Sequence, residues 1–131
     1  MVDEISYDDF AKLDIRIGTV IAAELVPETD KLIKCTIDFG LKPSAKTDGS
    51  PERPSGSDIL GERDIRTIVS GIAQWKTPEE LVGKQLPYIV NLAPRMLRGV
   101  ESQGMLLAAS DAEGVALLFA ERRVVNGTKL R

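Results

Sequence analysis

The chain contains no histidine, and Cys35 is its only cysteine. A histidine-dependent hydrolase triad and a histidine-ligated zinc site are therefore excluded, and no disulfide can form within one chain. No apolar run approaches the roughly 18 residues that a membrane-spanning helix needs. Aromatic residues make up only 5% of the sequence, so the stacking side chains of a general single-strand binder are scarce. These absences exclude several common classes of enzyme and membrane protein.

The 131 residues suit one domain, spanning 1–131, with a core that needs neither disulfides nor metal. The net charge of −3 argues against a protein that holds nucleic acid by bulk charge, although a local basic face remains compatible with it. The first ten residues carry four acids and no base, unlike a signal peptide, so we expect a cytoplasmic protein. Because the first recognisable motif begins soon after Met1, a separate polypeptide or subunit is favoured over a segment of a longer enzyme.

Alternating apolar residues predict a series of strands. Ile33, Cys35, Ile37 and Phe39 share one face of a half-buried strand, where Cys35 is expected to pack as a small hydrophobe. In the first strand the apolar alternation shifts after Gly18, which favours a β-bulge at that residue. The predicted strands span residues 14–26, 32–39, 65–72, 86–92, 103–110 and 115–120.

Two short helices are predicted from capping signals. Ser6 is followed three residues later by Asp9, near the exposed amides of a helical turn that would place Phe10 and Leu13 in the core. A second helix starts after Thr77, with Pro78 at its first position and Glu80 completing a capping box, and ends near residue 83.

Two segments are predicted to be loops. Residues 41–64 are rich in proline, glycine and serine and form a long loop insertion, whereas residues 93–101 form a shorter loop. The resulting element order predicts an all-β OB-fold: a five-stranded Greek-key barrel with one short helix between strands three and four, plus a C-terminal β extension. An SH3-like barrel or a small sandwich fits the same strands, and the position of the helix favours the OB-fold.

Catalytic chemistry has little support in the sequence. The carboxylates are scattered over predicted helix starts and turns, where capping explains them, so a carboxylate hydrolase is a minor alternative. Neither a phosphate-cradling GxxxxGK[ST] loop nor a GxGxxG fingerprint is present. We therefore expect no catalytic residues, no metal site and no cofactor.

A group of polar and basic residues is the better candidate for a site. The arginine fork can donate two hydrogen bonds to one phosphate, and serine and amide side chains can reach sugars and phosphates. The alternative is that the arginines are merely solvated, that Asn91 only caps a strand, that Met105 fills the core, and that Trp75 is a packing anchor. The candidate residues are Lys31, Asn91, Arg95, Arg98, Ser102, Gln103 and Met105.

The chain resembles the tRNA-binding domain family, found in bacterial methionyl-tRNA synthetases, in free-standing tRNA-binding proteins and in eukaryotic synthetase cofactors. The matching motifs are DFAKLDIRIG (9–18), PETDKL (27–32), VSGIA (69–73), PEELVGK (78–84) and NLAPRMLRGVESQGMLLAAS (91–110). The resemblance implies an OB-fold that binds the outer corner of L-shaped tRNA with little sequence preference. RNA duplexes hide their major groove, which favours recognition of shape and backbone.

The same resemblance implies site residues and partners. Arg98 lies within the motif at a more variable place, and residues 111–131 would help to build a homodimer. Methionyl-tRNA synthetase is the implied partner, and a CsaA-like secretion chaperone that binds unfolded polypeptides is the alternative function. The positions that match the tRNA-contact motif are Lys31, Ser70, Asn91, Arg95, Ser102 and Met105.

Overall fold

The computed structural model of the chain describes residues 3–41 and 63–131. Of the predicted loop insertion, residues 42–62 lie outside the described residues, while Leu41 ends one strand and Arg63 begins the next. The elements are α1 (Tyr7–Ala11), β1 (Ile15–Leu25), β2 (Ile33–Leu41), β3 (Arg63–Ser70), α2 (Pro78–Leu81), β4 (Gln85–Ile89), β5 (Arg95–Leu97), β6 (Val100–Ser102), β7 (Met105–Leu106), β8 (Ala108–Asp111) and β9 (Gly114–Leu117).

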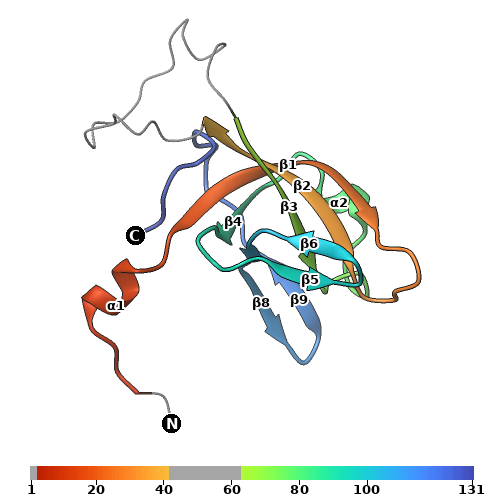
Figure 1. Cartoon of the computed structure of the whole chain (residues 1–131), viewed down its shortest axis with the longest axis horizontal. Coiled ribbons are helices and arrows are strands. Elements are labelled where there is room, and N and C mark those ends of the chain that lie inside the picture. Colours follow the sequence, from red (N-terminus) through yellow and green to blue (C-terminus); the bar gives the residue numbers. More distant parts are fainter. Residues whose placement is uncertain (1–2, 42–62) are drawn as a thin grey trace, which may run out of the picture.

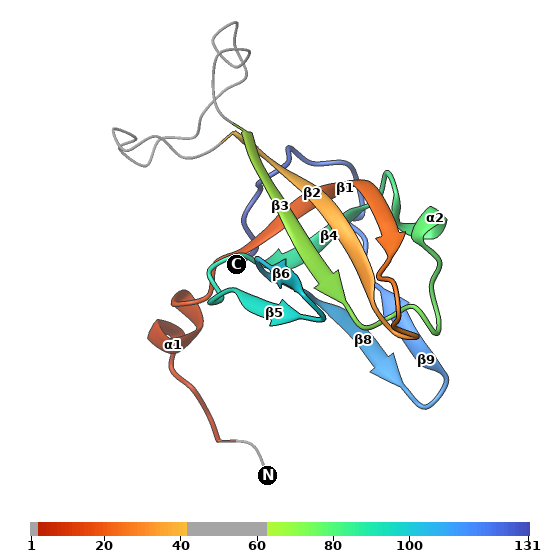
Figure 2. The same ribbon diagram turned by 45° about the vertical axis from the view of Figure 1, so that its right-hand side comes forward.

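Five strands form one antiparallel sheet in the order β3-β2-β1-β4-β7, and this sheet curls on itself (Figures 1 and 2). The short helix α2 lies between β3 and β4 in the chain, as the OB-fold prediction requires. The hairpins β5–β6 and β8–β9 are separate two-stranded sheets, and β9 lies within the predicted C-terminal extension 111–131. The OB-fold prediction is confirmed.

The core lies inside the curled sheet and contains the apolar face of β2. Ile33, Ile37 and Phe39 are almost completely buried, and the Phe39 ring meets Tyr88 edge-on at a centroid distance of 5.5 Å. Cys35 is buried in the same cluster, as predicted for a packed small hydrophobe. Its burial raises the pKa of the thiol to about 11, so the thiol stays protonated near neutral pH.

The bulge in β1 is present, but not at Gly18. The register between β1 and β2 shifts between Val20 and Ala22. Gly18 is required for a different reason, because a Cβ there would lie 2.5 Å from Ile37 Cγ2 and 2.7 Å from the Phe39 ring. The prediction placed the bulge at the residue that packs against the core instead of at the irregularity that follows it.

Both predicted N-caps are present, and each belongs to a capping box, although the box was predicted only at Thr77. Ser6 Oγ accepts from the Asp9 N–H at 3.2 Å, and Thr77 Oγ1 accepts from the Glu80 N–H at 3.3 Å. Helix α1 nevertheless has no buried residue and projects from the barrel (Figure 1). The prediction that Leu13 enters the core is wrong, since its side chain is 38% exposed. No helix in the described part of the chain is long and apolar enough to cross a membrane.

Two strand predictions need correction in the second half of the chain. Residues 103–110 do not form one strand: β7 pairs with β4, the chain then leaves the sheet, and β8 pairs with β9. The segment 93–101, predicted as a loop, contains β5 and the start of β6. Strands of two to four residues are too short for an alternating pattern to reveal them.

Candidate nucleic-acid interface

The β5–β6 hairpin presents two arginines from a segment that the sequence predicted to be a loop. Arg95 pairs with Ser102 at its base, and Leu97 pairs with Val100 next to the turn. The turn residues Arg98 and Gly99 both have positive φ, at 52° and 83°, which defines a type I′ hairpin turn. This tight turn places Arg98 at the tip of the hairpin.

Lys31 lies in the turn between β1 and β2. Its carbonyl accepts from the Ala73 N–H at 2.9 Å, which ties the turn to the chain after β3. The end of β3, where Ser70 pairs with Ile33, lies between the β1–β2 turn and the hairpin in both ribbon views (Figures 1 and 2). Lys31, Ser70 and the hairpin arginines are therefore brought to one end of the barrel.

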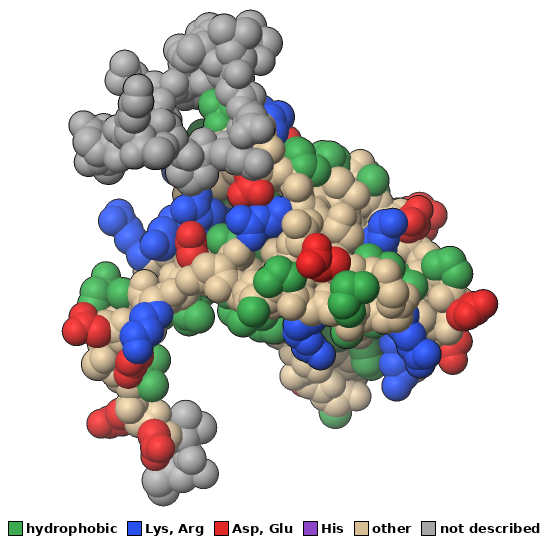
Figure 3. Space-filling view, viewed as in Figure 1, with side chains coloured by type: hydrophobic (Ala, Val, Ile, Leu, Met, Phe, Trp, Pro, Cys, Tyr) green, Lys and Arg blue, Asp and Glu red, His purple; other side chains and the backbone are tan. Residues whose placement is uncertain are grey.

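We call Lys31, Arg95 and Arg98 the hairpin patch. All three side chains are exposed. Among residues 3–41 and 63–131, none of them forms an ion pair with a carboxylate. Figure 3 shows one group of blue side chains at the lower right of the molecule and another at the upper left. The guanidinium and ammonium groups of the hairpin patch are thus available to anionic ligands, despite the net negative charge of the chain.

Ser102 is at the base of the hairpin, but its hydroxyl faces inward. The side chain is only 4% exposed, and Oγ accepts from the Val69 N–H at 2.9 Å and donates to the Gly104 carbonyl at 3.2 Å. Gln103, the next residue, also bonds β3: its N–H donates to the Thr67 carbonyl, and its Oε1 accepts from the Thr67 N–H. These two residues close the barrel along β3, so the structure gives Ser102 a positioning role under the patch.

Asn91 and Met105 lie together at the end of β4. Asn91 Oδ1 accepts from the Asp14 N–H at 2.9 Å, and its Nδ2 donates to the Lys12 carbonyl at 2.6 Å. The amide therefore joins the end of β4 to the start of β1, which agrees with the capping alternative. Met105 pairs with Ile89 in β7 and is 43% exposed, so it is not core filler.

Arg66, which the sequence analysis did not single out, supports the foot of the hairpin. Its guanidinium is paired with Asp64 at 2.9 Å and also donates to the backbone carbonyls of Val90 and Gln103. It also lies over the Phe39 ring, 5.7 Å from the centroid. The one available signal was the spacing of Asp64 and Arg66, which puts opposite charges on the same face of a strand.

A hollow of about 530 Å³ lies beside Arg66. It is bordered by the side of β3 and by the residues that follow β4. The acidic and basic side chains that line it already bond each other, so it offers fewer free polar groups than the hairpin patch. The lining residues are Asp64, Ile65, Arg66, Val90, Leu92, Pro94 and Gln103.

Among the described residues, no group of three or more potential metal ligands is found. Their buried side-chain nitrogen and oxygen atoms all have hydrogen-bond partners. Exposed cations are therefore the main chemical feature of this end of the barrel.

Comparisons with known proteins identify the family of the chain. A family model described as "Putative tRNA binding domain" matches residues 59–129. The chain belongs to the tRNA-binding domain family. It is 43% identical to a methionine–tRNA ligase from Porphyromonas gingivalis over 132 residues, and 44% identical to one from Bacteroides fragilis over 128 residues. These alignments cover 100% and 97% of the chain but only 16% of each ligase.

Solved structures of the family have the same fold. A MetRS related protein from Pyrococcus horikoshii superposes with a TM-score of 0.78 at 35% identity, covering 99% of this chain and 100% of that one. The chaperone CsaA from Bacillus anthracis superposes with a TM-score of 0.73 at 30% identity, covering 98% and 100%. The chain therefore corresponds to the tRNA-binding domain that the ligases carry, and its barrel is shared with a chaperone.

Proposed function

We propose that this domain binds the backbone of tRNA at the outer corner of the L, with little dependence on base sequence. The observation that carries the proposal is the hairpin patch, whose three exposed cations have no carboxylate partner among the described residues. Lysine and arginine bind phosphate oxygens, which carry no base sequence, and an RNA duplex is recognised mainly by its shape and backbone. The domain itself contributes no catalytic group.

The other predicted site residues fall into two groups in this proposal: some are expected to contact RNA, and others hold the contacting residues in place. Ser70 at the end of β3 and the exposed Met105 of β7 are expected to meet ribose with a hydroxyl and a thioether. Asn91 and Ser102 act mainly by positioning, because their polar atoms already bond the protein. Arg95 and Arg98 are expected to supply most of the contact with phosphate.

The biological role we propose is to assist methionyl-tRNA synthetase in the cytoplasm. The relatives that support this role are named methionine–tRNA ligases. A weak tRNA site that is joined to an enzyme, or bound to it, raises the local concentration of tRNA and so increases the overall affinity.

We also propose a homodimer built with the C-terminal segment 111–131. This segment begins at the last residue of β8 and contains β9, and the β8–β9 hairpin is a separate two-stranded sheet that stands apart from the main sheet. An exposed strand edge of this kind can pair with another copy of the chain. Sedimentation equilibrium tests this, with a dimer mass expected.

Hydroxyl-radical footprinting of intact tRNA tests the proposed binding mode. We expect protection of the backbone at the outer corner, and the same protection in tRNAs of different sequence. Protection that follows a particular anticodon or acceptor sequence would contradict the proposal.

A second candidate function is that of a CsaA-like chaperone for unfolded polypeptides. It is favoured by the CsaA neighbour and by exposed apolar side chains near the patch, with Met96 65% exposed and Leu92 41% exposed. An aggregation assay with a denatured protein separates the two functions. Suppression of aggregation by a domain that does not bind tRNA would favour the chaperone.

A further inference from the structure

Most of the proposed site lies in one segment that leaves the main sheet. Residues 91–102 follow β4 and lead back to the sheet at β7. Their β5–β6 hairpin is a two-stranded sheet by itself, so no ladder of backbone hydrogen bonds joins it to a strand of the main sheet. The positions of its side chains therefore depend on what holds the two ends of the segment. The site residues in this segment are Asn91, Arg95, Arg98 and Ser102.

Arg66 of β3 bonds both ends of this segment with one nitrogen atom. Its Nη1 donates to the carbonyl of Val90, the residue before the segment, and at 3.3 Å to the carbonyl of Gln103, the residue after it. Gln103 is held to β3 a second time, because its N–H donates to the Thr67 carbonyl at 2.8 Å. The entry and the exit of the segment thus meet at one point on β3. A link between the ends of a loop restricts all the residues between them.

The guanidinium of Arg66 is itself fixed in direction. Its Nε donates to Asp64 Oδ1 at 2.9 Å, and its Nη2 donates to Asp64 Oδ2 at 3.2 Å. It also lies 5.7 Å from the centroid of the Phe39 ring, which is buried in the core. Because the guanidinium is planar and rigid, the pairing of one edge with Asp64 sets the direction of Nη1 at the other edge.

The same bonds make Arg66 a poor ligand for RNA. Its side chain is 24% exposed, and every nitrogen of its guanidinium already donates to a protein oxygen. Bidentate binding of a phosphate needs two adjacent donors that are free. Arg95 and Arg98 differ in this respect, since neither is in an ion pair within residues 3–41 and 63–131.

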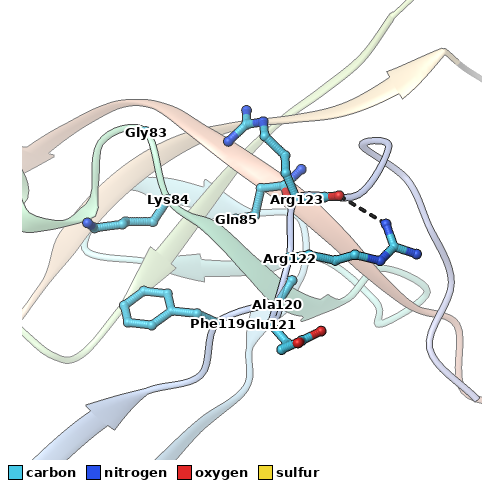
Figure 4. Close-up of a pocket in the computed structure, with 8 residues that line it drawn as sticks. All are labelled: Gly83, Lys84, Gln85, Phe119, Ala120, Glu121, Arg122 and Arg123. Carbon is cyan, nitrogen blue, oxygen red and sulfur yellow. Dashed lines mark hydrogen bonds between the residues drawn. The ribbon is translucent and has the colours of Figure 1, made fainter.

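The barrel uses a long polar side chain in the same way at a second place. In Figure 4, Gln85 lies next to Arg123, the residue before Val124. Gln85 Oε1 accepts from the Val124 N–H at 3.0 Å, and its Nε2 donates to the Val124 carbonyl at 2.6 Å. Gln85 thus holds the chain that follows β9 to the start of β4. In both places a buried or half-buried side chain, instead of a neighbouring strand, fixes a segment outside the main sheet.

We propose that Arg66 is a positioning residue for tRNA binding, which acts through the β5–β6 hairpin and does not touch the RNA. This inference rests on the proposed tRNA function and deepens it, because it names the side chain on which the placement of Arg95 and Arg98 depends. Lys31 is independent of Arg66, since its turn is held by the Ala73 N–H. Loss of the Arg66 fork should therefore remove the two hairpin arginines from the RNA and leave Lys31 in place.

The first test is the salt dependence of tRNA binding by Arg66→Lys. This variant keeps the charge, but one ammonium group cannot bond Asp64 with a planar fork and reach both carbonyls. Three phosphate contacts give a slope of about −2.7 for log affinity against log salt, and Lys31 alone gives about −0.9. We expect the affinity to fall and the slope to move from the first value toward the second. Equal affinity and slope in Arg66→Lys would overturn the inference.

Arg16→Lys is the matched control. Arg16 pairs with Asp14 in the same way, two residues apart on a strand, with an Nε–Oδ1 distance of 2.8 Å and a side chain that is 26% exposed. Its printed side-chain bonds do not include residues 91–102, so the control should bind tRNA like the wild type. Circular dichroism at the temperature of the binding assay shows whether each variant is folded.

A double-mutant cycle separates positioning from direct contact. The charge-neutral change Asp64→Asn/Arg66→Met removes the fork and leaves no unpaired carboxylate. It should weaken tRNA binding in the wild-type background and have no further effect in the Arg95→Ala/Arg98→Ala background, where no hairpin arginine is left to position. Direct contact with RNA, or a general loss of folded protein, would lower the affinity by the same factor in both backgrounds and would overturn the inference.

A measurement without RNA completes the test. ¹⁵N relaxation of free Arg66→Lys should show lower order parameters than the wild type at residues 95–102 and unchanged values at residues 33–39. An equally rigid hairpin would overturn the inference. Failure of the wild-type protein to bind tRNA would refute the proposed function itself, whereas wild-type affinity in both Arg66 variants would refute only the role of Arg66.

Discussion

The Arg95→Ala/Arg98→Ala double variant tests the hairpin patch most sharply through the salt dependence of tRNA binding. Each phosphate neutralised by a cation contributes about 0.9 to the slope of log affinity against log salt on a duplex. Three contacts give a slope near −2.7, so that affinity falls about 40-fold between 50 and 200 mM salt. With only Lys31 left, the slope is near −0.9 and the fall is about 3- to 4-fold.

Fluorescence anisotropy with labelled total tRNA over this salt range measures both slopes. The matched control is Lys34→Ala/Arg63→Ala, which removes the same charge. Those two side chains are already paired with Glu24 and Asp38, so they offer less to a phosphate. We expect the control to keep a slope close to that of the wild type. An unchanged slope and affinity in the Arg95→Ala/Arg98→Ala variant would refute the assignment of both arginines.

Three further predictions concern the frame that holds the patch. Ser102→Ala leaves the buried Val69 N–H without its partner, so urea denaturation should show a loss of about 1–3 kcal/mol in the free energy of unfolding. Gly104→Ala places a Cβ 2.8 Å from a backbone carbonyl oxygen and should destabilise the fold by about 1–3 kcal/mol, whereas Gly71→Ala, with its nearest atom 4.0 Å away, should not. Hydrogen bonds hold the pKa of Glu80 below its ordinary value of 4.5, so its contribution to stability is present above pH 4.5 and is lost as the pH falls through the lowered pKa. Thermal denaturation from pH 3 to 6 should show this dependence in the wild type and a smaller one in Glu80→Gln, whereas equal profiles would contradict the role of the cap.

The parts of the fold that were predictable depend on local signals. Ile33 to Phe39 alternate between the core and solvent because successive side chains of a strand point to opposite faces. The capping boxes at Ser6 and Thr77 need only four consecutive residues each, so they too could be read from the sequence. The order of these elements was enough to indicate the OB-fold.

The hairpin that carries the patch was missed for two physical reasons. Its strands are three residues long, so they contain no repeat of an alternating pattern. Its turn places Arg98 at positive φ, a position where asparagine, aspartate or glycine is the usual signal. Without those signals, a proline and a glycine within nine residues indicated a loop.

The roles of Ser102 and Asn91 were also beyond sequence reasoning. The partners of their polar groups are distant in the chain, Val69 for Ser102 and Asp14 for Asn91. Only the closure of the barrel brings these groups together. The sequence alone therefore could not show that the polar atoms of these two side chains are bonded within the protein.

The most direct test of the central claim compares the affinity of this domain for intact tRNA with its affinity for an acceptor minihelix that lacks the outer corner. The two RNAs share an acceptor stem, and the comparison is made at equal salt and expressed per phosphate. We predict clearly tighter binding of intact tRNA, and the difference should shrink in the Arg95→Ala/Arg98→Ala variant. Equal affinity for the two RNAs would contradict recognition of the corner by the hairpin patch.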